Sequence, residues 1–255
     1  FPVSKNGRLT VKYEWASKSL SNIDTVNSSI LIATGASAAT FTASTIGFTY
    51  SFDNRNSGLN PDAGMTFRVS QKFAGPGGAT RYSKTSALAG VRSSVFSRDI
   101  VVSAEIEGGY LNSLGGTSNI TDRFFMGETV MRGYAANGIG PRDLSATNTD
   151  ALGGNVFAVA RVEANFPIGL PEEYGISGGM FFDVGSLWGL DTTSGKSQNE
   201  TTGVASVSMQ LRAVMGVSVF WETAVGPLRF NFSRVLSGPT YDNAEAFSLS
   251  IGKRF

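Results

Sequence analysis

Hydrophobic and polar residues alternate along most of this 255-residue chain. Ile46, Phe48 and Tyr50, for example, are separated by glycine and threonine. A period of two places successive side chains on opposite faces of a strand. The same pattern predicts about ten strands, at residues 7–19, 38–53, 64–73, 80–95, 99–111, 154–166, 174–188, 205–221, 228–233 and 247–255.

The lengths of these segments favour a membrane barrel. Most run for about 10 to 16 residues, whereas strands of soluble proteins average about 5 to 6 and tilted membrane-spanning strands need about 9 to 11. Short connections alternate with long ones, as is typical of outer-membrane barrels. The short ones are 96–99, 167–174 and 223–227, and the long ones are 21–37, 112–153 and 191–204. A short helix is expected at 27–35 inside the first long loop.

The two faces of the strands differ sharply in polarity. One face is aliphatic and aromatic, and the other combines small residues with charged ones: Arg68, Lys72, Arg161, Glu163, Asp183, Arg212, Arg229 and Arg254. A soluble β-sandwich would turn the apolar face inward, whereas a membrane barrel turns it toward lipid and lines a wet lumen with the polar face. Aromatic residues near strand ends (Trp15, Trp188, Trp221 and Phe255) favour the barrel.

Composition excludes several classes of function. The chain has no cysteine and no histidine, which removes disulfides, thiol nucleophiles and imidazole chemistry, and a net charge of +1 argues against nucleic-acid binding. No EF-hand-like acidic loop is present, so neither a metal nor a cofactor is expected. The paired carboxylates Glu105/Glu107 and Glu172/Glu173 are interpreted as lumen-facing and turn residues, so we expect no enzyme. Because the chain starts at Phe1 without a signal-like segment, we expect a processed chain or a fragment.

The longest segment without a strand pattern, about 112–153, contains the run MRGYAANGIGPRD (131–143). Its candidate functional residues are Met131, Arg132, Gly133, Tyr134, Gly140 and Pro141. Glycines at 133, 138 and 140 permit tight turns. A loop of this length within a β protein is usually functional or disordered, and its composition argues against simple disorder.

Four segments of the chain resemble the BamA family of outer-membrane protein assembly factors. The run at 131–143 resembles the family's Arg-Gly-Phe loop motif, with Met131 for the usual valine and Tyr134 for phenylalanine. Residues 153–168 resemble the strand that follows this loop. Residues 180–188 resemble its next aromatic strand, shortened by one residue before the aspartate, and GPLRFNFSRVL with AEAFSLSIGKRF resembles its last hairpin.

The resemblance implies an all-β fold, a transmembrane antiparallel barrel of sixteen strands preceded by periplasmic POTRA domains. Residues 1–255 would form one C-terminal part of that barrel, its last ten strands, with a long extracellular loop (about 112–153) folded inward. The POTRA domains and the first strands would then be absent. The sequence leaves open whether the ten strands are a fragment or close on themselves.

The resemblance also implies roles for particular residues. Arg132 is expected to pin the loop to Glu163 and Asp183, which the alternation places on the inner wall; the alternative is a solvated loop arginine. The terminal strand, with Phe247, Leu249, Ile251, Gly252 and Phe255, resembles the β-signal recognised during barrel assembly. A simple aromatic anchor at the membrane interface would give the same pattern.

The function implied is insertion of β-barrel proteins into the bacterial outer membrane. Unfolded outer-membrane clients, outer-membrane lipids and accessory lipoproteins (bound mainly through POTRA domains) would be the partners, with no nucleic acid, cofactor or nucleotide. Other interpretations remain: a TamA-like factor or a two-partner secretion pore on the same scaffold, a simple diffusion porin, and a soluble lectin-like β protein.

Overall fold

A single antiparallel sheet of ten long strands forms the body of the molecule. The computed structural model describes residues 1–19, 24, 26–37, 41–56, 61–75, 77–96, 99–223 and 226–251. The strands of this sheet are β1 (Gly7–Lys18), β2 (Phe41–Asp53), β3 (Gly64–Ala74), β4 (Tyr82–Val95), β5 (Ile100–Ser113), β7 (Val156–Pro167), β8 (Ile176–Trp188), β10 (Arg212–Thr223), β11 (Gly226–Ser237) and β12 (Phe247–Ile251).

Shorter elements lie in the connections between the long strands. They are α1 (Ile30–Ser37), the 3-10 turns η1 (Ile120–Asp122) and η2 (Glu172–Tyr174), and a small two-stranded sheet of β6 (Arg142–Asp143) and β9 (Val204–Ala205). The short helix predicted near 27–35 is therefore present as α1. Within the described part of the chain, none of the helices has the length and apolarity needed to cross a membrane.

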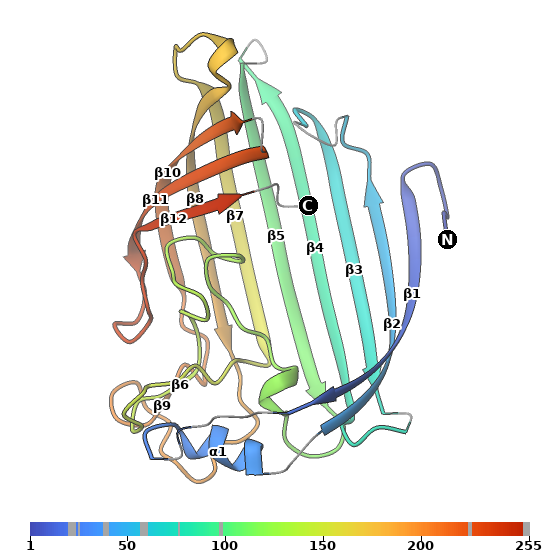
Figure 1. The fold of residues 1–255 in the computed structure, drawn as a ribbon, viewed down its shortest axis with the longest axis vertical. Coiled ribbons are helices and arrows are strands. Elements are labelled where there is room, and N and C mark those ends of the chain that lie inside the picture. The colour runs from blue at the N-terminus through green and yellow to red at the C-terminus, as the bar shows by residue number, and fades with distance from the viewer. Residues whose placement is uncertain are drawn as a thin grey trace.

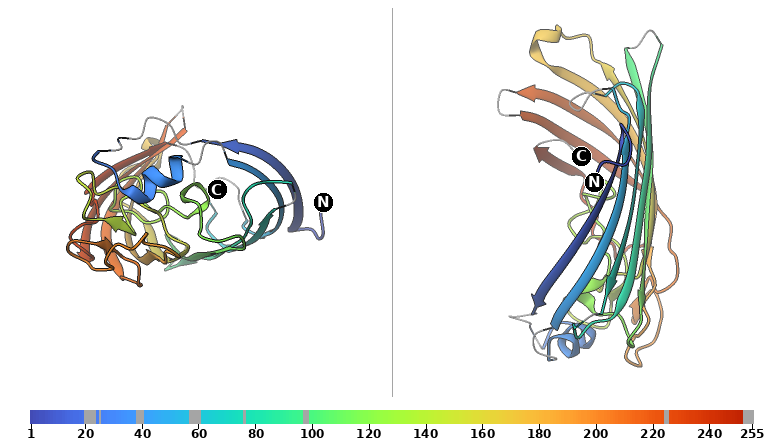
Figure 2. Two further views of the ribbon diagram at one scale, coloured as in Figure 1. Left: turned by 90° about the horizontal axis from the view of Figure 1, so that it is seen from below. Right: turned by 90° about the vertical axis from the view of Figure 1, so that its right-hand side faces the viewer.

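Each strand of the large sheet pairs with its neighbour in chain order, from β1 to β12. β1 pairs only with β2, and β12 pairs only with β11, so the described strands form an open wall with two free edges. This wall curves into a trough in the view along the strands (Figure 2). The prediction of about ten antiparallel strands is confirmed.

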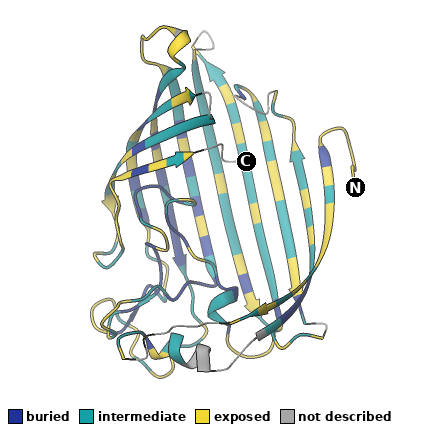
Figure 3. Ribbon diagram, in the orientation of Figure 1, coloured by how far each residue is buried: buried dark blue, intermediate teal, exposed yellow. Residues whose placement is uncertain are grey.

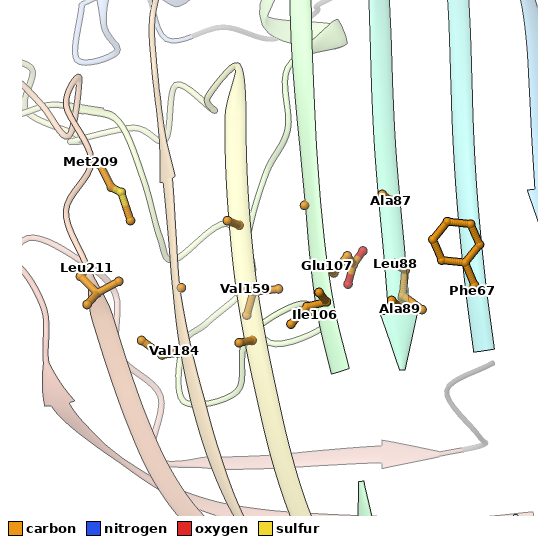
Figure 4. A pocket seen from close by; sticks show the side chains of 14 residues that line it. Phe67, Ala87, Leu88, Ala89, Ile106, Glu107, Val159, Val184, Met209 and Leu211 are labelled. Atoms are coloured by element: carbon orange, nitrogen blue, oxygen red, sulfur yellow. The ribbon is translucent and has the colours of Figure 1, made fainter. Parts of the chain in front are cut away.

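The outer face of the wall is apolar and exposed. Tyr13, Trp15, Ile106 and Met180 on this face all expose more than half of their surface, with Tyr13 at 62%. Buried residues instead concentrate in β7, β8 and the segment folded against their inner face (Figure 3). An apolar groove of about 490 Å³ lies on the outer face between Phe67 and the Met209–Leu211 segment (Figure 4). Such a surface suits lipid, not water.

One predicted strand begins later than its pattern indicated. Residues 205–221 alternate regularly, but β10 starts only at Arg212. Ser206 has a positive φ of 52°, which turns the chain out of the ladder. Its N–H binds the Glu200 carboxylate, and the Gln210 carbonyl accepts from Ser186 Oγ at 2.7 Å. Over 206–211, side-chain contacts and a backbone bond from the Gly189 N–H to the Val207 carbonyl at 3.1 Å therefore take the place of a regular strand ladder.

The connections follow two distinct rims. Those at one end of the wall, at 54–63, 96–99, 168–175 and 224–225, are short. Those at the other end include three long ones, at 19–40, 114–155 and 189–211, and two shorter ones, at 75–81 and 238–246. The long ones gather at one end of the wall with α1, β6 and β9 (Figure 1). In outer-membrane barrels the long loops face the outside of the cell, and the short turns face the periplasm.

Candidate functional site

The long connection between β5 and β7 folds back against the inner face of the wall (Figures 1 and 2). Its apolar side chains join those of β7, β8 and β10 in one buried cluster: Met126, Met131, Tyr134, Ile139, Phe157, Val159, Phe181, Leu187 and Val214. Met131 and Tyr134 are 0% and 1% exposed. The loop motif is therefore part of the core of the molecule.

Arg132 is the polar centre of this packed loop. Its Nε donates to Asp183 Oδ2 at 2.8 Å and its Nη2 to Asp183 Oδ1 at 2.5 Å. Nη1 donates to Glu163, and the backbone N–H of Arg132 also binds Asp183 Oδ2 at 3.1 Å. Two parallel bonds to one carboxylate form the fork that only arginine provides. The structure thus brings together the three residues that the alternation pattern and the resemblance had linked.

Two further residues complete the surroundings of this group, and sequence analysis did not assign them. The Arg132 guanidinium carbon lies 3.8 Å from the centre of the Phe181 ring, which provides a cation–π contact. Arg229 of β11 donates from Nη2 to the same Glu163 carboxylate. Both side chains share the inward parity of Asp183 and Glu163, so the register of β7, β8, β10 and β11 places them there.

Charge is balanced inside the buried group. Two arginines, Arg132 and Arg229, face two carboxylates, Glu163 and Asp183. Burial alone would lower the pKa of Arg132, but its hydrogen bonds to Asp183 and the charges of both carboxylates raise that pKa above its ordinary value. Arg132 therefore stays charged at every accessible pH. Removing one member would leave an uncompensated buried charge, which costs far more than an exposed pair is worth.

Glycine is required at two positions of the motif. Gly133 has a φ of 85°, and a Cβ there would lie 2.7 Å from Val214 Cγ1. Gly140 has a φ of 115°, and its Cβ would lie 2.5 Å from Leu187 Cδ2. Both glycines therefore combine a left-handed backbone with close approach to the wall. Pro141 follows directly, and its carbonyl accepts from the Leu152 N–H at 2.8 Å.

The connection between β11 and β12, residues 238–246, holds the motif from the other side. The Glu245 N–H donates to the Gly133 carbonyl at 3.0 Å, and the Ala135 N–H donates to the Asn243 carbonyl at 2.9 Å. Tyr134 forms a β-bridge with Ala244, and burial raises the pKa of its hydroxyl to about 12. The motif therefore lies between the inner wall and the last hairpin.

Two more buried arginines anchor the same region. Arg161 of β7 binds both Glu105 and Glu107 of β5, and its Nη1 donates to the Val130 carbonyl at 2.5 Å just before the motif. Both glutamates thus face the lumen, as expected. Arg212 binds Asp242 at 2.7 Å, with both side chains at most 1% exposed, and so fixes the β11–β12 connection.

Asp143, at the end of the motif, joins three connections at the rim with the long loops. Its carboxylate accepts from Ser29 Oγ at 2.5 Å and pairs with Lys196 Nζ at 2.5 Å. Burial would raise the pKa of Asp143, but the Lys196, Ser145 and Ser29 hydrogen bonds outweigh it and lower that pKa below its ordinary value. The loop motif is therefore fixed at both ends.

The terminal strand lies at a free edge of the wall. Phe247, Leu249 and Ile251 point to the outer face and are 47%, 48% and 72% exposed. The Phe247 ring packs against Phe232 with centroids 5.3 Å apart. Gly252 and Phe255 lie outside the described residues. Among the residues described, no group of three or more acidic side chains is placed to hold a metal ion.

Comparison with known proteins agrees with this architecture. The chain matches the Omp85 superfamily domain over residues 1–255. It is 30% identical over 220 residues to the outer membrane protein assembly factor BamA of Neorickettsia risticii, covering 86% of this chain and 28% of that protein. It is also 29% identical over 151 residues to the sorting and assembly machinery component 50 homolog of Bos taurus, covering 56% of this chain and 31% of that protein.

A solved structure shares the fold. The structure of BamA from Haemophilus ducreyi lacking POTRA domains 1–3 superimposes with a TM-score of 0.81 at 19% identity, covering 98% of this chain and 51% of that one. The chain thus spans about half of that structure and under a third of the two sequence relatives. Its location, as the β-barrel wall and the relatives indicate, is the bacterial outer membrane. The resemblance to assembly barrels is confirmed, and the chain belongs to the Omp85 superfamily.

Proposed function

We propose that this chain is the C-terminal part of a barrel that inserts other β-barrel proteins into the bacterial outer membrane. The observation that carries the proposal is the pinned loop, in which Arg132 binds Glu163 and Asp183 on the inner wall. A diffusion pore needs an open lumen, whereas here a long loop fills the space in front of β7 and β8. The names of the relatives, an assembly factor and a sorting and assembly component, support the same function.

The activity would work through the edge of a strand in the wall, and the candidate within this chain is the last strand, β12. An unpaired strand edge is a template for another strand. A client strand would therefore add to an edge by backbone hydrogen bonds, with its apolar side chains facing lipid. β12 carries Phe247, Leu249 and Ile251 on that lipid side. Adding strands in this way forms hydrogen bonds only, so it requires no enzyme chemistry, cofactor or nucleotide.

In this scheme the loop motif has a positioning role. Arg132 ties the loop to β7 and β8, and the loop in turn holds the β11–β12 connection through Gly133 and Asn243. The last hairpin then keeps a fixed place relative to the wall while its edge receives a client. The partners in this proposal are unfolded client proteins, outer-membrane lipids and accessory lipoproteins.

The test is client insertion with the complete protein in liposomes. The rate of folding of a small β-barrel client is followed by its resistance to protease, for wild type, Arg132→Ala, Arg132→Lys and the exposed control Arg81→Ala. We expect wild type and Arg81→Ala to accelerate insertion equally. Arg132→Ala should be about tenfold slower or worse, since about 1.4 kcal/mol of lost docking shifts an equilibrium tenfold. Arg132→Lys should fall between them, because lysine keeps the charge but loses the fork.

Two controls make the result decisive. Gel mobility before and after heating shows whether each variant is still folded, so slow insertion by a folded Arg132→Ala implicates the pinned loop. Ion conductance is measured in the same liposomes. If wild type conducts ions but does not accelerate insertion, the protein is a pore and the proposal is wrong.

A further inference from the structure

The inner wall of β1–β4 carries a pair of lysines that the assembly function does not explain. Lys72 of β3 and Lys84 of β4 are direct partners in the antiparallel register. Direct partners of this kind have Cβ atoms about 4.5 to 5.5 Å apart, and like charges in these positions are destabilising. Both side chains face the lumen and line the same cavity. A like-charged pair in this position calls for a compensating charge.

Among the described residues, no carboxylate forms a direct ion pair with Lys72 or Lys84, although Glu14 and Asp122 lie nearby. Neither lysine ammonium lies within 4.0 Å of one. The two acidic residues that line the cavity are already paired with other lysines: Asp122 binds Lys18 at 2.7 Å, and Glu14 binds Lys12 at 3.0 Å. The positive charge of Lys72 and Lys84 therefore remains open toward the cavity.

The cavity is large enough to hold a small anion together with water. Its volume is about 200 Å³, and it lies between the wall and η1 at the start of the long loop. Lys84 is held by the Asp122 carbonyl, 2.6 Å from its Nζ, and by the Phe124 ring, 4.0 Å from Nζ. The hydroxyls of Ser70, Ser86 and Tyr82 also line it. Ammonium and hydroxyl groups are the donors that oxyanions accept from.

We propose that Lys72 and Lys84 bind an oxyanion of phosphate size in this cavity, between β3, β4 and the start of the long loop. The anion bridges the two ammonium groups and removes their repulsion. Since Thr121 and Asp122 of η1 form one side of the cavity, the bound anion also links the loop to the N-terminal strands. This inference is independent of the assembly function.

The test is thermal unfolding of the complete protein in a non-ionic detergent. Tm is measured with rising inorganic phosphate, with acetate, and with chloride at matched ionic strength. At about tenfold excess over Kd, phosphate should raise Tm of the wild type by about 3 to 6 °C over chloride. If acetate acts as phosphate does, the site takes carboxylates as well; if only phosphate acts, the site selects the tetrahedral anion. Equilibrium dialysis with radiolabelled phosphate gives the stoichiometry directly.

Matched variants separate this site from general charge effects. Lys72→Gln removes one member of the pair without touching the bonds that hold Lys84, so its Tm in chloride should equal or exceed that of wild type. Its response to phosphate should be lost. Arg68→Gln makes the same charge change on β3 away from the cavity and should respond as wild type does. Equal Tm in phosphate and chloride for wild type, or an undiminished response of Lys72→Gln, would overturn the proposal.

Discussion

The two halves of the inner wall differ in how their inward-facing charged side chains are paired. From β5 onward each of four inward arginines has a carboxylate partner: Arg132, Arg161, Arg212 and Arg229. On β1–β4 basic residues outnumber acidic ones on the inner face, and three of them are the lysines Lys12, Lys72 and Lys84 in one row across the strands.

The difference follows from water. Where the loop covers the wall, charges are desolvated, and only a planar guanidinium with matched carboxylates satisfies them. Where the wall is more open, a lysine ammonium keeps part of its hydration, so an ion pair contributes less to stability than in the covered area. Lys12, which pairs with Glu14 at 3.0 Å, has 68% of its side chain exposed, against 7% for Arg132. Among the described residues, buried arginine–carboxylate pairs therefore mark the area that the loop covers.

The largest effect on stability is expected at Asp183, which is fully buried and accepts three hydrogen bonds from Arg132. Asp183→Asn leaves the arginine without its main counter-charge, so we expect a loss of about 3 to 5 kcal/mol in the free energy of unfolding. Urea unfolding in detergent measures it. Lys72→Gln on the open half serves as the contrast and should cost nothing. Similar losses for both variants would remove the distinction between the halves.

A smaller loss is expected at Gly133. Gly133→Ala adds a Cβ at a φ of 85° and 2.7 Å from Val214 Cγ1, so it should destabilise the protein by about 1 to 3 kcal/mol. Gly116 has a φ of 112° but open space around its Cβ position. Gly116→Ala therefore measures the backbone part alone and should cost about 1 kcal/mol. An equal loss in both variants would show that the close approach to Val214 is unimportant.

The edge of the covered area should show an intermediate response. Glu107 binds Arg161 at 2.6 Å with 26% of its side chain exposed, and Glu105 remains as a second acceptor. Glu107→Gln should therefore cost about 1 kcal/mol or less in the free energy of unfolding. Repeating the measurement at high salt sharpens the contrast, because salt should weaken this pair more than the Arg132 group. A loss of unfolding free energy as large as that of Asp183→Asn would show that the desolvated area reaches β5.

The smallest effect concerns pH at the rim. The pKa of Asp143 is lowered in the folded protein, so its contribution to stability is present above about pH 3.9, the unfolded value, and is lost as pH falls through the folded pKa. Hydrogen exchange of residues 142–145 and 196–204 should therefore accelerate at pH 3 relative to pH 5, after correction for intrinsic rates. Asp143→Asn should exchange rapidly at both pH values. Unchanged protection of the wild type at pH 3 would contradict this prediction.

Much of the fold could be predicted from the sequence because successive residues of a strand point to opposite faces, so the two faces appear as an alternating pattern. The strands and the inward side of Glu163 and Asp183 follow from that period. The same rule failed at 206–211, since the alternation of Val207, Met209 and Leu211 says nothing about the turn at Ser206. Alternation describes side-chain faces, and only hydrogen bonding decides whether a strand forms.

The site could be predicted only in part, because its remaining contacts depend on register. Arg229 shows the right parity, but its meeting with Glu163 requires the order of four strands. The opposition of Lys72 and Lys84 requires the β3–β4 register to the residue. The bonds between the motif and residues 243–245 involve backbone atoms, which leave no trace in side-chain pattern.

The position of the motif between the wall and residues 238–246 predicts an order of events during folding. Proteins with many contacts between residues distant in sequence fold slowly. The β11–β12 connection covers Gly133 and Tyr134, so the loop must enter the trough before that hairpin swings into place. If the hairpin formed first, it would block the loop from the inner wall, and the carboxylates of Glu163 and Asp183 would lack their partner Arg132. We therefore expect a chain in which Arg132 has not reached Glu163 and Asp183 to complete its last hairpin more slowly.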